Sequence, residues 1–206
     1  MNKFDAGYYF LGRPKKREDL PSLTPDEVTS ERDFRYAPQS LSSPPLVFFS
    51  GAREYNARHG GAAIKSPPAI LFEGSNMLVR DELRQALLAL AVPDLHMHPA
   101  HYVHDDGRTY DGYWYLAFAA RFDCWDREHS DYDREEDPVS LGGHLLEQVY
   151  SYSLNAALLE EMPLQQRLFF QLGGALSASF ICHASLCSLF HDAGGNAIQL
   201  TLVTEY

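Results

Sequence analysis

The sequence predicts an α+β fold with a mixed, largely antiparallel sheet, flanking helices and an irregular, proline-rich N-terminal segment. Apolar runs of strand length mix with amphipathic helices, but without the strict strand-helix-strand rhythm of a parallel sheet. An Asp-Gly turn in the middle of the chain is flanked by two strand patterns, which indicates an antiparallel hairpin. The chain has 206 residues, of which 45% are hydrophobic. This length is enough for one domain with a buried core, or for one domain with a small satellite.

Residues 1–65 are expected to form an irregular segment or a small subdomain, and residues 66–206 an α+β domain. Six prolines interrupt residues 1–45, where they work against regular structure. One short helix is predicted there, with Thr24 as its cap and Pro25 in its first position. The apolar run at 46–49 predicts a strand.

The pattern becomes clearer after Pro68. The predicted elements are strands at 69–72, 95–103, 110–121, 147–154, 167–172 and 198–203, and helices at 83–90, 155–161 and 184–192. In the predicted helix at 83–90, Leu83, Leu87 and Leu90 recur at the spacing of one helix face. Pro93 then ends it, because the residue before a proline avoids the helical region.

The charge is unevenly distributed along the chain. With 17 basic and 28 acidic residues the formal net charge is −11, but residues 1–60 carry +1 and residues 61–206 carry −12. Such an acidic part repels phosphate backbones, so we expect no nucleic-acid partner. It would attract a basic protein, although acidity can also serve solubility alone.

Targeting and redox features are sparse. No apolar run approaches the roughly 20 residues that a membrane helix needs, and the first residues lack the apolar core of a secretory signal. Three cysteines, Cys124, Cys182 and Cys187, cannot form a disulfide framework. We therefore expect a soluble, cytoplasmic protein without a membrane partner.

Residues 123–137 are the strongest interaction feature. They hold eight carboxylates against two arginines and supply −6 of the net charge. The order of the carboxylates differs from that of an EF-hand loop, although calcium binding stays open. The other two interpretations are mimicry of nucleic-acid phosphates in a basic active site and a merely solvated loop. Trp125 and Tyr132 interleave with the charges, a composition found at protein interfaces.

A second candidate site is a group of four histidines within nine residues, His96, His98, His101 and His104. Such a group can bind a transition metal. The pattern resembles the H-x-H-x-D-H signature of metallo-β-lactamase-like hydrolases, but Ala100 occupies the aspartate position. On a strand, His98 and His101 would also point to opposite faces. We expect no metal or other cofactor, and a metal-dependent hydrolase that uses His96, His98 and His101 remains the alternative.

Residues 44–206 resemble immunity family 11, a family of bacterial immunity proteins from polymorphic toxin systems. The resemblance rests on residues 68–72, 83–87, 113–116, 122–126 with 130–132, and 167–170 with His183. It implies a protein that is not an enzyme and that binds a cognate toxin delivered by contact-dependent or type VI secretion. No catalytic residues come with the resemblance.

The sequence therefore predicts an immunity protein that neutralises a basic toxin by stoichiometric occlusion. Homodimerisation through exposed aromatic residues stays open. The predicted partner-binding residues are Asp105, Asp106, Asp123, Trp125, Asp126, Glu128, Asp131, Tyr132, Asp133, Glu135 and Glu136.

Overall fold

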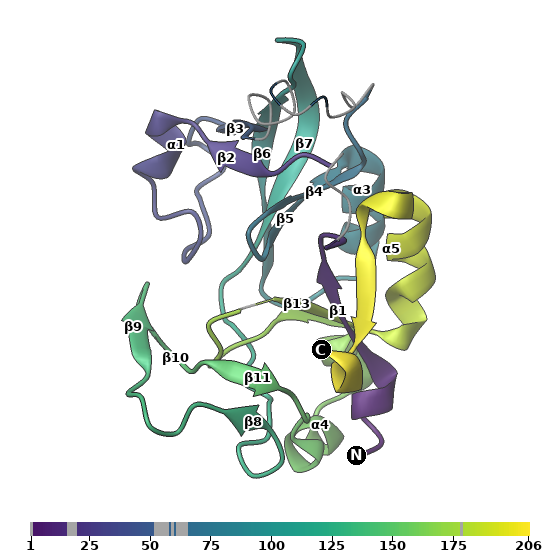
Figure 1. The fold of residues 1–206 in the computed structure, drawn as a ribbon. Coiled ribbons are helices and arrows are strands. Elements are labelled where there is room, and N and C mark those ends of the chain that lie inside the picture. The colour runs from purple at the N-terminus through teal and green to yellow at the C-terminus, as the bar shows by residue number, and fades with distance from the viewer. Residues whose placement is uncertain (1, 16–19, 52–57, 59, 61–65, 178) are drawn as a thin grey trace.

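Two β-sheets form the framework of the protein (Figure 1). The structure is a computed structural model, and it describes residues 2–15, 20–51, 58, 60, 66–177 and 179–206. The larger sheet has six strands in the order β2-β3-β6-β7-β5-β4. These strands are Leu23–Pro25, Leu46–Ser50, Leu95–Val103, Thr109–Phe118, Asn76–Arg80 and Ile70–Glu73.

Strand directions confirm the predicted fold class. In the six-stranded sheet β3 and β6 run parallel, and the other neighbouring pairs are antiparallel. The central pair, β6 and β7, is the predicted hairpin, and Leu95 lies opposite Phe118. The chain is therefore an α+β protein with a mixed, largely antiparallel sheet.

The smaller sheet places the N-terminal residues inside the fold. Its order is β12-β13-β1-β14, formed by Phe169–Gln171, Phe180–His183, Tyr8–Gly12 and Gln199–Leu202. Strand β1 pairs on both sides, with β13 and with β14. This differs from the prediction of an irregular N-terminal segment. The prolines begin only at Pro14, and the run before them buries Tyr8, Phe10 and Leu11.

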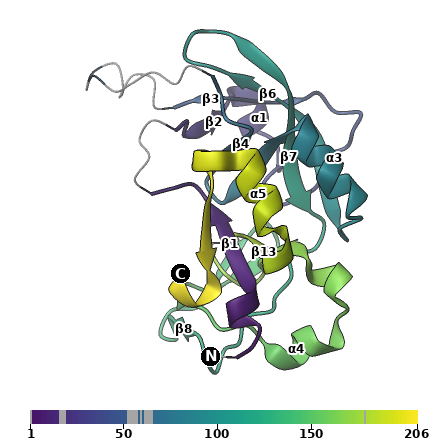
Figure 2. The ribbon, with the colours of Figure 1, turned by 90° about the vertical axis from the view of Figure 1, so that its right-hand side faces the viewer.

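Short helices flank the sheets. They are α1 (Glu27–Ser30), α3 (Asp81–Ala89), α4 (Ala156–Glu161) and α5 (Cys187–Gly194). Figure 2 shows α3 and α5 on the same side of the molecule. Single 3-10 turns lie at Asp5–Gly7, Leu164–Arg167, Ala184–Leu186, Gly195–Ala197 and Val203–Glu205. Within the described ranges, no helix has the length and apolarity that crossing a bilayer would require.

The first helix begins later than predicted. Thr24 and Pro25 belong to strand β2, and Asp26 caps α1 by accepting a hydrogen bond from the Thr29 backbone N–H at 2.7 Å. Pairing of β2 with β3 competes for the same residues, and the backbone of Thr24 lies opposite Phe49. A capping pattern in the sequence cannot show that competition.

The core covers both faces of the six-stranded sheet. One cluster includes Leu83, Leu116, Phe169 and Phe190, and joins this sheet to α3, α5 and the smaller sheet. A second cluster lies on the opposite face, where the ring of Phe34 packs edge-on against Tyr115 with the ring centroids 5.2 Å apart. Burial on both faces explains why β5 has no polar alternation in its central residues.

Two short antiparallel strand pairs follow the larger sheet, and the hairpin of the second pair lies between the two strands of the first in the sequence. Strand β8 (Asp131–Tyr132) pairs with β11 (Val149–Ser151), and β9 (Val139–Leu141) pairs with β10 (His144–Leu146). Both lie at the end of the molecule away from the β6–β7 turn (Figure 1). The predicted acidic segment, residues 123–137, runs through β8 and ends just before β9.

Candidate functional site

The acidic segment, residues 123–137, begins in the core. The Trp125 side chain is only 1% exposed, and its backbone forms a bridge to Leu154. Next to it, the Asp126 backbone N–H donates to the Ser153 carbonyl at 2.8 Å. Trp125 was predicted as a partner-binding residue, and the structure corrects this. An indole that is already buried cannot present an apolar surface to a partner.

Three of the predicted carboxylates have partners within the segment. Asp123 accepts a hydrogen bond from Arg127 Nη2 at 2.7 Å, and the guanidinium of Arg127 lies 3.7 Å from the centre of the Trp125 ring. Asp126 accepts from the backbone N–H of Glu128 at 2.8 Å and from Nδ1 of His129 at 3.0 Å. Asp123 and Asp126 therefore hold the start of the segment in place.

Asp133 is the third carboxylate with internal partners. It accepts hydrogen bonds from the backbone N–H groups of Glu135 and Glu136, and these lower its pKa. The Tyr150 hydroxyl also donates to it at 3.2 Å. Burial would raise the pKa of Asp126, but the hydrogen bonds from Glu128 and His129 outweigh it and lower that pKa as well. Both groups stay ionised near neutral pH and order the backbone around them.

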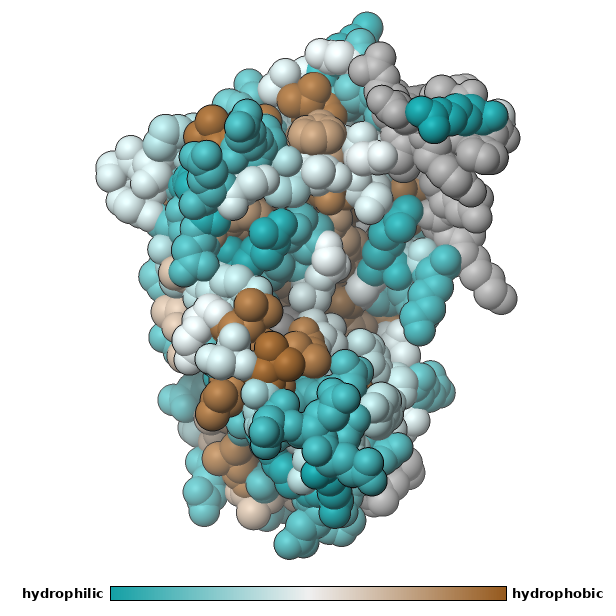
Figure 3. Space-filling model, turned by 60° about the vertical axis from the view of Figure 1, so that its left-hand side comes forward, coloured by the Kyte–Doolittle hydropathy of each residue, from teal (hydrophilic) through white to brown (hydrophobic). Residues whose placement is uncertain are grey.

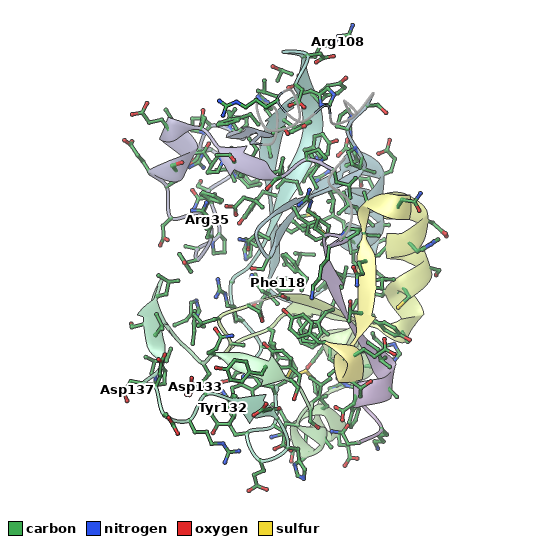
Figure 4. The ribbon with its side chains drawn as sticks, viewed as in Figure 1. Arg35, Arg108, Phe118, Tyr132, Asp133 and Asp137 are labelled. Carbon is green, nitrogen blue, oxygen red and sulfur yellow. The ribbon has the colours of Figure 1, made fainter. Side chains whose placement is uncertain are left out.

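The remaining carboxylates of the segment point to solvent. In the described part of the chain they form no ion pair and accept no side-chain hydrogen bond; they are Glu128, Asp131, Glu135, Glu136 and Asp137. Tyr132 lies half-buried between them, edge-on to Trp125 with the ring centroids 5.0 Å apart. Figure 4 shows Tyr132, Asp133 and Asp137 at the same end of the molecule. These groups form the charged half of the candidate site.

The β9–β10 hairpin forms the apolar half, and sequence reasoning missed it. It begins directly after Asp137-Pro138 and exposes Val139, Leu141 and Leu145, the last to 68%. The face in Figure 3 shows apolar side chains gathered at mid-height beside a broad hydrophilic area. The sequence does carry a signal for this hairpin, which is the pair Gly142-Gly143 between apolar residues. Both glycines have the positive φ angles that a tight hairpin turn needs.

Gly142 fixes the position of this hairpin. Its φ is +58°, and a Cβ atom built there would lie 2.1 Å from Cγ of Tyr36. The tip of the hairpin therefore packs directly on the loop that follows α1. Glycine is needed here both for the backbone angle and for the close approach.

The structure separates Asp105 and Asp106 from the acidic segment. Both lie in the β6–β7 turn, where Asp106 accepts from the Arg108 backbone N–H at 2.9 Å. Figure 4 shows Arg108 at one end of the molecule and Asp133 and Asp137 at the other. The predicted site residues therefore do not form one surface, because the β6–β7 turn lies at the opposite end of the molecule from strands β8 to β11 (Figure 1).

The histidines are not arranged as a metal site. His98 is buried, and its Nε2 lies 3.0 Å from the Pro44 carbonyl oxygen and 3.3 Å from Nη2 of Arg32. His101 lies 3.4 Å from a carboxylate oxygen of Asp111. In the ranges that the structure describes, no group of three His, Cys, Asp or Glu side chains could hold a metal ion. The geometry therefore gives the hydrolase alternative no support.

No protein-family model matches the chain, and no curated protein matches it. The resemblance to immunity family 11 therefore stays a prediction. The physical features of the site are the basis for a functional proposal.

Proposed function

We propose that this protein is a cytoplasmic immunity protein that binds a cognate toxin with a basic surface and blocks it by stoichiometric occlusion. The binding surface consists of Glu128, Asp131 and residues 135–145. No covalent chemistry takes part. The toxin is one delivered by contact-dependent or type VI secretion, as the family resemblance implies.

One observation carries the proposal: exposed carboxylates without internal partners run directly into an exposed apolar hairpin. Desolvated apolar side chains supply most of the binding energy at interfaces, whereas charged rims steer association and select the partner. Val139, Leu141 and Leu145 have the first property, and Glu135 to Asp137 have the second. A loop that served solubility alone has no need of a neighbouring apolar surface.

The decisive experiment co-expresses this protein with the toxin domain encoded by the neighbouring gene. The wild-type protein should restore growth and form a stoichiometric complex. Reversal of Glu135, Glu136 and Asp137 to Lys should slow association by about tenfold or more at low salt, because steering is electrostatic. The difference should shrink as the salt concentration rises.

A matched control carries the same change in net charge elsewhere. Glu31→Lys, Glu82→Lys and Asp192→Lys replace exposed carboxylates next to α1, on α3 and on α5. This variant should protect cells nearly as well as the wild type. Equal loss in both triple variants would show that only total charge matters. Failure of the wild-type protein to bind or protect would reject the immunity function itself.

A further inference from the structure

A pocket of 160 Å³ lies between the β9–β10 hairpin and the turn that joins β4 to β5. Its lining combines the charged side chains of Arg35, Glu73 and Arg121 with the apolar side chains of Leu141, Leu146 and Leu176. The volume equals about five water molecules at liquid density, so any ligand must be small. In Figure 4, Arg35 lies above strands β8 to β11 and below the β6–β7 turn.

Arg35 and Glu73 neutralise each other. Nε of Arg35 donates to both carboxylate oxygens of Glu73, at 2.9 and 3.2 Å. Asn76 Nδ2 also donates to Glu73 at 3.3 Å. The Glu73 carboxylate is therefore fully hydrogen-bonded within the protein. Together, Glu73 and Arg35 add no net charge to the pocket.

Among the residues that the structure describes, Arg121 has no carboxylate partner. Its Nη2 donates to the backbone carbonyl of Arg35 at 3.0 Å, and its guanidinium lies 5.4 Å from the centre of the Tyr36 ring. Its Nη1 is shielded from solvent and makes no hydrogen bond in the described part of the chain. Burial lowers the pKa of Arg121, and the groups that oppose this effect are Tyr36 and Tyr115 rather than a carboxylate. Within the described residues, Arg121 is therefore a partly desolvated cation that lacks a counter-ion.

Tyr115 lies near Arg121 but does not supply a counter-charge for it. Its side chain is 1% exposed, and the hydroxyl has no hydrogen-bond partner within the described residues. Burial raises the pKa of Tyr115, as does the charge of Glu73, while Arg35 and Arg121 lower it. Tyr115 therefore stays neutral and does not compensate the charge of Arg121. An uncompensated cation beside an open pocket is stabilised when an anion enters.

We propose that this pocket binds a small monocarboxylate with a short aliphatic chain. Its carboxylate lies against the guanidinium of Arg121, and its aliphatic chain lies against Leu141, Leu146 and Leu176. Inorganic phosphate fits less well, because it has no apolar part to bury against the leucines. This proposal does not rest on the toxin-binding function, although Leu141 lines the pocket and also belongs to the proposed toxin-binding surface.

The test is a titration of the full chain with butanoate at constant ionic strength, followed by protein-observed NMR. Butanoate should bind saturably with one site per chain. Butanamide, which has the same shape without the charge, should not bind saturably, and phosphate should bind more weakly than butanoate. Arg121→Gln should weaken butanoate by about tenfold or more, as expected when a charged hydrogen-bonding group is lost.

A second variant protects the test against misfolding. Leu176→Trp adds bulk to a partly exposed residue that lines the pocket, and it should abolish binding. Arg108→Gln removes an exposed arginine in the β6–β7 turn and should leave binding unchanged. No saturable butanoate binding, equal binding of butanamide, preferred binding of phosphate, or full binding in Leu176→Trp would each overturn the proposal.

Discussion

Residues 123–132 and residues 135–145 both combine carboxylates with apolar side chains, but the two stretches use them in opposite ways. Around residues 123–132, Asp123 and Asp126 are held by Arg127, His129 and the backbone, and Trp125 is buried. Around residues 135–145, the carboxylates and the apolar side chains are both exposed. Most side chains of the first stretch build the fold, although Glu128 and Asp131 stay exposed, and the second stretch is available to a partner. The number of carboxylates along the sequence does not distinguish a structural role from a binding role. The presence or absence of an internal partner for each described carboxylate does.

The largest effect is expected from Trp125→Ala. Removing a fully buried indole should lower the free energy of unfolding by about 3–5 kcal/mol, through lost burial and a cavity. Urea unfolding monitored by far-ultraviolet circular dichroism measures the change. A loss of toxin binding with unchanged stability would instead make Trp125 an interface residue and would break the comparison.

Two neighbouring leucines in β10 test the same contrast between a buried and an exposed side chain. Leu146 is 2% exposed and Leu145 is 68% exposed. Leu146→Ala should cost about 2–5 kcal/mol, whereas Leu145→Ala should change stability by no more than about 0.5 kcal/mol. Leu145→Ala should nevertheless weaken the complex with the toxin. Equal costs of unfolding for the two variants would show that Leu145 packs against the protein itself.

A smaller effect is expected from Asp126→Asn, and it should depend on pH. The folded-state pKa of Asp126 is lowered, so its stabilising contribution is present above its ordinary pKa of about 3.9 and disappears as pH falls through the lowered value. The variant should be less stable than the wild type at pH 7. That difference should narrow in acid, which urea unfolding at pH 7 and pH 3 can measure. An undiminished difference at pH 3 would mean that ionisation plays no part.

Alkylation of cysteines tests burial without changing stability. Burial raises the pKa of Cys124, which lies next to Trp125 in residues 123–132, whereas a hydrogen bond from Cys182 lowers the pKa of Cys187 to about 7. Iodoacetamide should therefore modify Cys187 in the native protein, with a half-maximal rate near pH 7. Cys124 should react only after unfolding, and mass spectrometry of digested Cys187→Ser protein provides the control. Comparable native labelling of Cys124 would show that the core around Cys124 opens in the native protein.

Much of the fold was predictable because its signals are local. The β6–β7 hairpin follows from alternation around the turn at Gly107, and α3 follows from the spacing of Leu83 and Leu87. Asn155, which begins the predicted helix at 155–161, caps α4 by accepting from the Leu158 backbone N–H at 3.0 Å. By contrast, β1 was missed because pairing with β13 and β14 joins residues far apart in the sequence.

The candidate site was predictable only in part. Eight carboxylates in residues 123–137 are visible in the sequence, as is their location after a hairpin. The sequence does not show that Asp123 pairs with Arg127, or that the β6–β7 turn, where Asp106 contacts the backbone of Arg108, lies at the far end of the molecule (Figure 4). The β9–β10 hairpin has a readable turn, but which of its leucines is exposed depends on remote packing. Tyr36 against Gly142 is one such remote contact.

The sequence by itself determined the fold class, the charge asymmetry and most elements after residue 68, because periodicity and turn chemistry depend on near neighbours. Only the tertiary structure decided that Trp125 is core, that Leu145 is surface and that no described carboxylate pairs with Arg121. Exposure and charge compensation depend on which distant segments cover a side chain. They are set when the sheets, loops and hairpins pack together.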